Sequence, residues 1–478
     1  MPAEALAKAG GVSGVSGRGP WLWVVAAGVA LGFAYTLSPL TVLVALTMVP
    51  LWRWASAGLT AQERRWMLTL FGVAVALRVV SIGGLFLTAD PAIPYANFFG
   101  DEEFFKRKTT WLRNVSMGIP ISKADFIYAF DRTGDSSYLH VLSYLQALVG
   151  LAPYGIHVLN AAAYLAAVVV LYKLVRPAFG GIAALMGSTL LLFVPSLFIW
   201  SISALKEPLY FLVAATTVAS AMAMARAPGW GRRIAAVLVV IAGGVALQGL
   251  REGGLALTVM GVVGGYTLWF VLTRPRVLMV ACLVLPLLVP VALSRPAVQD
   301  RAWAAVHQVA LKHWGYINTP GQTYRLMEPQ FYLDRQEIQA MTPRQVGQYG
   351  MRAAWSYITV PLPWEIESRS ALAFLPEQMV WYSLLLLLPF GIVAGLRRDP
   401  LLTCVLLAHG CASALVVAVS GGNVGTLVRH RGLALPYLVW LSGLGAVQLA
   451  LYLLSRAPSR RAAALVSIPD SDGGLPCP

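Results

Sequence analysis

The chain has 478 residues, of which 58% are hydrophobic and only 12% are charged, about half the charged share of an ordinary soluble protein. Its mean hydropathy is +0.68, and apolar runs of about 18 to 22 residues, long enough to cross a bilayer as helices, recur along most of it. These values exclude a soluble globular protein and predict an all-α polytopic membrane protein. The formal net charge is +15. The basic residues cluster between apolar runs, as membrane orientation requires, so no nucleic-acid partner is expected.

Residues 1–19 are rich in Ala, Gly and Ser and are predicted to form a disordered N-terminal tail. The apolar stretch 21–52 is too long for one comfortable crossing and is interrupted at Ser38-Pro39, so it predicts two short spans joined by a tight turn. About twelve transmembrane helices are expected in all, within a range of about 10 to 13. The ten that follow the first pair are predicted at 67–87, 154–174, 181–200, 209–225, 234–250, 255–272, 277–293, 380–396, 401–420 and 433–454.

The distribution of Lys and Arg predicts the orientation of these spans. With the N-terminus in the cytoplasm, every short inner loop is basic, as the positive-inside rule requires. This orientation makes 20–454 one transmembrane domain in the cell membrane and 455–478 a cytoplasmic tail. It also puts two long polar segments, 88–138 and 294–379, on the outer face, where their aromatic residues predict amphipathic helices at the lipid interface.

Three short outer turns contain cations that the positive-inside rule does not explain. They are Lys206 in SALKEP, Arg251 in LREGG, and Arg429 and Arg431 in GGNVGTLVRHRG. Neighbouring acids and lipid headgroups could satisfy each cation locally. Four cations at the outer ends of separate spans also suggest one shared anionic ligand, such as a lipid phosphate.

The first outer segment begins with an acidic sequence, NFFGDEEFF, that contains Asp101, Glu102 and Glu103. Carboxylates close to a membrane surface are poorly hydrated, and poor hydration makes a carboxylate more basic. A carboxylate of this kind suits a general base that removes a proton from an acceptor hydroxyl or amine. The alternative is a solvated acidic turn that is neutralised by Lys106, Arg107 and Lys108.

A span followed by an acidic pair in an outer loop resembles the integral-membrane glycosyltransferases of the GT-C superfamily, such as protein mannosyltransferases and aminoarabinose transferases. The resemblance continues in SYLHVLSYLQALVGL, HVLNAAAYL, LLFVPS and SALKEP, and more loosely in RHRGLALPYLVWL. It implies a GT-C-like fold with 88–138 as the catalytic loop, Asp101 as the leading catalytic residue and Glu102 as its helper. An extra apolar pair precedes the catalytic span, in contrast to that pattern.

The resemblance also implies the substrates. The donor would be a sugar linked to polyprenyl phosphate, with its phosphate bound by Lys206, Arg251, Arg429 and Arg431. The acceptor would be an envelope glycan, a lipid or a protein. A divalent ion, Mg²⁺ or Mn²⁺, at Asp101 and Glu102 stays open, because one acidic cluster without a second placed ligand does not define a metal site.

The second outer segment, 294–379, is assigned to acceptor binding and closure of the site. Its candidate acceptor ligands are His313, Tyr324 and Glu328, although aromatic residues at this density are more often interfacial anchors. Two other functions stay open: a polymerase or ligase of lipid-linked polysaccharides, and a transporter or flippase. The second is less favoured because the spans contain few charges beyond Arg78 and show no obvious similarity between halves.

Overall fold

A computed structural model describes residues 19–456, except 38, 89–96, 99–100, 133, 153, 320, 367–371 and 373. The predicted tails, 1–19 and 455–478, therefore lie almost entirely outside the described residues. Within the described part the secondary structure is helical, with one isolated bridge between Thr323 and Asn423. The predicted all-α class is confirmed for these residues.

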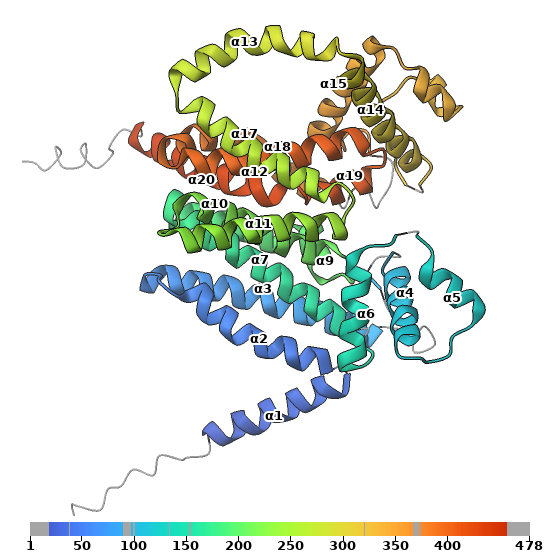
Figure 1. Cartoon of the computed structure of the whole chain (residues 1–478). Helices are drawn as coiled ribbons and strands as arrows, with labels where there is room; N and C mark the ends of the chain where they lie inside the picture. The colour runs from blue at the N-terminus through green and yellow to red at the C-terminus, as the bar shows by residue number, and fades with distance from the viewer. Residues whose placement is uncertain are drawn as a thin grey trace, which may run out of the picture. The chain divides into compact units, whose positions relative to one another are not determined.

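The helices are labelled in Figure 1. In chain order they are α1 (Gly19–Leu37), α2 (Pro39–Ser56), α3 (Ala61–Thr88), α4 (Asp101–Ser116), α5 (Lys123–Phe130), α6 (Ser137–Val149), α7 (Gly155–Phe179), α8 (Gly181–Phe193), α9 (Pro195–Ile202), α10 (Glu207–Arg226), α11 (Trp230–Leu250), α12 (Gly254–Leu272), α13 (Pro275–Leu293), α14 (Pro296–Ile317), the 3-10 helices η1 (Pro329–Tyr332) and η2 (Gln336–Ala340), α15 (Pro343–Thr359), α17 (Leu375–Arg398), α18 (Pro400–Ser420), α19 (Val424–Arg431) and α20 (Leu435–Arg456).

Ten of the described helices are long and apolar enough to cross a membrane, and α8 with α9 would make an eleventh as a bent pair. This number lies within the predicted range and makes the chain a multi-pass membrane protein. The apolar stretch 21–52 forms two helices, as predicted, but only α2 is among the ten candidate spans, because the apolar part of α1, Trp21–Gly32, is shorter than a span.

The span predicted over 181–200 is not one continuous helix, because the chain breaks between α8 and α9. The two helices are bent by 64°, and Val194 between them has an extended conformation with φ −58° and ψ 125°. The reason is Pro195, which cannot donate a backbone hydrogen bond and disfavours the helical conformation of the residue before it.

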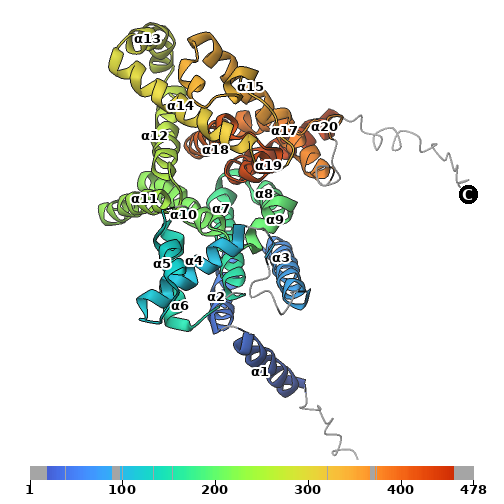
Figure 2. The same cartoon turned by 90° about the vertical axis from the view of Figure 1, so that its right-hand side faces the viewer.

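The chain forms two compact units. Unit 1 consists of Met1–Ala167, Ile199–Leu212 and Gly249–Arg251, and unit 2 of Val168–Phe198, Val213–Gln248 and Glu252–Pro478. In unit 1, α4 packs against both α5 and α6, as both views of the fold show (Figures 1 and 2). Leu112, Ala129 and Leu139 form the buried core between these three helices. The first outer segment thus folds as a small helical layer.

In unit 2, α17 packs along α20, and α12 packs along α18. The first pair is close because Gly391 of α17 lies against the backbone carbonyl of Leu441, where no Cβ would fit. The helices of the second outer segment, α14 and α15, pack on α18. In contrast, none of the residues of α13 is buried.

Candidate functional site

The three acidic residues of the first outer segment form the first turn of α4 but lie in different environments. Asp101 is exposed and Glu102 is completely buried. Glu103 is partly exposed and forms an ion pair with Arg107, with 2.5 Å between Oε1 and Nη2. Unpaired backbone N–H groups at a helix start favour negative side chains, which explains why an acidic sequence begins this helix. The solvated acidic turn considered above therefore describes Glu103, whereas Glu102 needs a different explanation.

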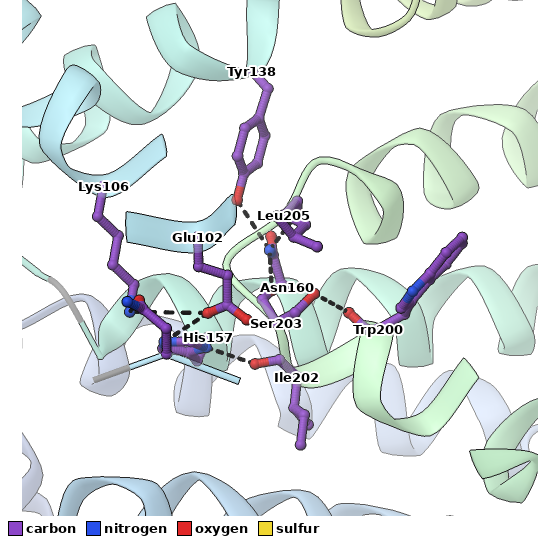
Figure 3. A network of polar contacts seen from close by, with 10 residues as sticks. Glu102, Lys106, Tyr138, His157, Asn160, Trp200, Ile202, Ser203 and Leu205 are labelled. Atoms are coloured by element: carbon purple, nitrogen blue, oxygen red, sulfur yellow. Dashed lines mark hydrogen bonds and ion pairs between the residues drawn. The ribbon is translucent and has the colours of Figure 1, made fainter. Parts of the chain in front are cut away.

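Glu102 belongs to a buried cluster with Lys106 and His157 (Figure 3). Its Oε2 lies 3.9 Å from Nζ of Lys106 and 3.7 Å from Nε2 of His157. Nζ of Lys106 also donates a 3.1 Å hydrogen bond to Oδ1 of Asn97. A buried charge is costly unless it is paired. Burial lowers the pKa of Lys106 to about 8, and the charge of Glu102 opposes this shift.

The same side of α7 carries a second polar residue, Asn160, beside the SALKEP turn (Figure 3). Its amide nitrogen donates to the hydroxyl of Tyr138 over 3.0 Å, and to the carbonyls of Ser203 and Leu205 over 2.7 Å each. Burial raises the pKa of Tyr138, which therefore stays a neutral hydroxyl. Lys206, a predicted phosphate ligand, is half-buried and lies within this turn, directly after Leu205.

An apolar pocket of about 430 Å³ lies between α2, α3 and α7 in unit 1. Its lining includes Met48 of α2, Gly83 and Phe86 of α3, and Tyr154 directly before α7. The ring of Phe86 packs against that of Tyr154 with centroids 4.9 Å apart, and Tyr154 lies 6.5 Å from the ring of His157. One residue of the pocket lining, Tyr154, therefore lies next to His157 of the buried cluster.

Arg78, one of the few charges within the spans, lines this pocket from α3. Its Nε donates to Oγ of Ser201 over 2.9 Å and its Nη1 to the carbonyl of Ala74 over 3.0 Å. The guanidinium also lies 5.5 Å from the centre of the Tyr164 ring. These contacts explain a charge in the middle of a span as a structural group.

The four predicted phosphate ligands are divided between the two units. Lys206 and Arg251 belong to unit 1, as do Asp101 and Glu102, whereas Arg429 and Arg431 belong to unit 2. Lys206, Arg251 and Arg429 are half-buried.

Arg431 is buried and holds the segment that follows α15. Its guanidinium donates to Oε1 of Gln378 over 2.6 Å, and to the carbonyls of Tyr357 over 2.6 Å and Val360 over 2.5 Å. It also lies 4.8 Å from the centre of the Trp381 ring. Burial lowers its pKa to about 10, so it stays charged. The geometry thus gives Arg431 a role in packing.

The candidate acceptor residues lie where the second outer segment meets the turn before α19. His313 is completely buried, with Nδ1 2.6 Å from the carbonyl of Gly421 and Nε2 2.8 Å from the hydroxyl of Tyr332. Burial lowers its pKa to about 4, so the ring is neutral. The backbone N–H of Tyr324 donates to the carbonyl of Gly422 over 3.1 Å. These contacts fasten the segment to the turn.

Glu328, the third candidate, is half-buried and accepts a 3.0 Å hydrogen bond from Nε2 of Gln345. It therefore contributes to the internal contacts of the second outer segment.

The turn at Gly421, Gly422 and Asn423 is thus a close contact between segments. Asn423 caps α19 through its side-chain oxygen, which accepts from the backbone N–H groups of Gly425 and Thr426. A Cβ on Gly422 would lie 2.6 Å from the carbonyl oxygen of His313. Glycine is required here because the backbones approach so closely.

We expect Gly422→Ala to loosen the second outer segment. The new methyl group would clash with the backbone carbonyl of His313, which should lower the free energy of unfolding by about 1 to 3 kcal/mol. Thermal unfolding in detergent should begin at a lower temperature, and limited proteolysis should cut 296–366 faster. Gly315→Ala is the matched control, because a Cβ there has open space on α14. Equal behaviour of the two variants would contradict the close contact.

Two residues of the buried cluster, Lys106 and His157, were not among the predicted site residues. His157 could have been found from the sequence, because it and Asn160 are polar residues three positions apart in an otherwise apolar span. Among the residues that the structure describes, no three His, Cys, Asp or Glu side chains are grouped so that they could hold a metal ion.

Comparison with known proteins gives one distant similarity. No protein-family model and no curated protein sequence matches the chain. Among solved structures, the chain is similar to the crystal structure of ArnT from Cupriavidus metallidurans bound to undecaprenyl phosphate, with 14% identity and a TM-score of 0.35. The similarity covers 83% of this chain and 81% of that one.

Proposed function

We propose that the protein is a membrane glycosyltransferase of the GT-C type that uses a polyprenyl-phosphate sugar as its donor. It would act at the outer face of the cell membrane, with both termini in the cytoplasm. The observation that supports this function best is an apolar pocket between spans whose lining residue Tyr154 lies next to a buried ionisable cluster, which adjoins an exposed carboxylate. A lipid with a charged, reactive head and a long apolar tail matches that arrangement.

In the proposed reaction, Asp101 removes the proton from an acceptor hydroxyl. The acceptor oxygen forms a bond to the anomeric carbon of the sugar, while the bond from that carbon to the phosphate oxygen breaks. Its electron pair stays on the departing polyprenyl phosphate, and the proton stays on Asp101. A single displacement of this kind inverts the anomeric configuration. Lys206, Arg251 and Arg429 are proposed to stabilise the charge that develops on the phosphate.

Glu102 is proposed to assist Asp101 from the buried side of α4, without contact with the substrates. Since it is paired with Lys106 and His157 in the interior, it fixes the first turn of α4 and thereby the direction of Asp101. The acceptor is an envelope glycan, a lipid or a protein, bound beside the second outer segment. ArnT, with which the chain shares the distant similarity, was crystallised with undecaprenyl phosphate, a lipid of the class proposed here.

The function is tested with purified protein reconstituted in vesicles. A panel of polyprenyl-phosphate sugars is supplied with envelope glycans, lipids and peptides, and the expected result is a glycosylated acceptor and free polyprenyl phosphate in equal amounts. Joining of lipid-linked oligosaccharides would instead identify a polymerase or ligase. Movement of the donor across the membrane without a covalent product would identify a flippase.

We expect Gly83→Leu to weaken use of the lipid donor by about tenfold. Gly83 lines the pocket and a side chain there would meet no neighbour, so a leucine would occupy space that the prenyl chain fills. Displacing two methylene groups costs about 1.6 kcal/mol, or about tenfold in KM.

Gly84→Leu is the matched control for this prediction. The next residue of α3 is exposed, also has open space for a side chain, and does not line the pocket. Its KM for the donor should stay within twofold of wild type. A similar rise in KM for both variants would argue against a lipid chain in the pocket.

A further inference from the structure

Two side chains of α7 hold the turn that leads into Lys206. His157 and Asn160 are three positions apart, so they lie on the same face of the helix, and both are completely buried. Nδ1 of His157 lies 2.6 Å from the carbonyl oxygen of Ile202. The amide of Asn160 reaches the carbonyls of Ser203 and Leu205. Three carbonyls within four residues, the last one of α9 and two of the turn after it, therefore have partners on α7.

These carbonyls need such partners because α9 ends at Ile202. The last carbonyls of a helix have no partner within it, and in the interior of a membrane protein water does not replace them freely. The path of the chain from α9 to α10 thus depends on His157 and Asn160. Lys206 is the last residue of that path, since α10 begins at Glu207.

The other ring nitrogen of His157 faces Glu102. A carbonyl oxygen can only accept, so Nδ1 carries a hydrogen, and Nε2 is the atom that lies 3.7 Å from Oε2 of Glu102. Lys106 faces the same carboxylate from the next turn of α4. One imidazole ring thus contacts both the Lys206 turn and the start of α4.

We infer that His157 is a positioning residue that sets the arrangement of the acidic start of α4 relative to the Lys206 turn (Figure 3). The inference rests on the proposed function, in which Asp101 is the base and Lys206 a phosphate ligand. His157 acts through two other groups: the Glu102 carboxylate, which follows Asp101, and the Ile202 carbonyl, which begins the turn.

Two conservative variants separate these contacts. Asparagine at position 157 puts its amide nitrogen near the Nδ1 position and keeps the donation to Ile202. Glutamine reaches the Nε2 position and keeps the contact with Glu102. We expect His157→Gln to raise KM for the lipid-phosphate sugar about fivefold, the effect of one net hydrogen bond, with kcat nearly unchanged. His157→Asn should lower kcat by about the same factor with KM nearly unchanged.

His140→Gln is the control for these kinetics, since His140 is an exposed histidine on α6 that pairs with Asp135. It should change neither parameter. The same changes of KM and kcat in both His157 variants would overturn the inference, because the contacts with Ile202 and with Glu102 would then have no separate effects. Wild-type kinetics in both variants would overturn it as well.

A second measurement does not depend on sugar transfer. Reductive methylation of the Lys206 amine in the intact detergent-solubilised protein is followed by mass spectrometry of its peptide. The rate should rise several-fold in His157→Gln, whereas His157→Asn should match wild type. An equal rate in all three proteins would overturn the inference. If the methylation rates follow this pattern but the protein transfers no sugar, the role of His157 in the turn is supported. In that case only the proposed function is rejected.

Discussion

Replacing Asp101 by asparagine should abolish sugar transfer without unfolding the protein. The amide has the same shape as the carboxylate but cannot take the proton of the acceptor, and loss of a general base lowers a rate by about 10² to 10⁴-fold. Because Asp101 is exposed at the start of α4, the change should affect stability by no more than about 0.5 kcal/mol. The measurement is kcat at saturating donor and acceptor in reconstituted vesicles, with thermal unfolding in detergent.

The control for this prediction is Glu103→Gln, two residues further along the same turn. It removes an ion pair with Arg107 whose two side chains are 41% and 48% exposed, and pairs this accessible contribute about 0 to 1 kcal/mol. Transfer should stay within twofold of wild type. Full activity of Asp101→Asn would refute Asp101 as the base, and equal loss in both variants would point to the charge of the turn as a whole.

Arg431→Ala should destabilise the protein, unlike Arg429→Ala. Without the guanidinium, the carbonyls of Tyr357 and Val360 lose buried donors, and each unpaired buried acceptor costs about 1 to 3 kcal/mol. The free energy of unfolding is therefore expected to fall by at least about 2 kcal/mol in total. This loss should be visible as a clear drop in the thermal unfolding temperature. Arg431→Lys should recover only part of it, because one ammonium group cannot replace a planar fork that also stacks on Trp381.

Arg429→Ala is the comparison two residues away. Arg429 is half-buried and is proposed to bind the donor phosphate, so its variant should unfold near the wild-type temperature but show a raised KM for the donor. If Arg431→Ala were as stable as Arg429→Ala and raised the donor KM equally, both arginines would be phosphate ligands and the packing role of Arg431 would be refuted.

The membrane-spanning fold is predicted well by the sequence because span length and apolar composition follow directly from bilayer thickness. The break at Val194 was missed although Pro195 was visible, since hydropathy does not distinguish a straight helix from a bent one. The small residues in contact with other backbone, such as Gly422, were also not predictable, because the close approach involves segments distant in the chain.

The candidate site was predicted less completely, and α4 shows why. Glu102, Lys106 and Thr109 lie on one buried face of this helix, but a polar face normally indicates exposure to solvent. Without the position of His157, nothing in the sequence distinguished Glu102 from its two acidic neighbours. The arginines of α19 are a similar case. Residues two apart on a helix point in different directions, so their closeness in the chain does not predict that Arg431 is buried and Arg429 only half-buried.

The lack of buried residues in α13 has a consequence for mutational tolerance. A span without buried residues has to be apolar and long enough to cross a bilayer, but little packing selects among its side chains. Val, Leu and Ile should therefore be interchangeable at most of its positions. Gly391 is the opposite case, because the carbonyl of Leu441 occupies the space that any larger residue would need. Random mutagenesis would therefore find a permissive stretch in α13 and strict positions along the contact of α17 with α20.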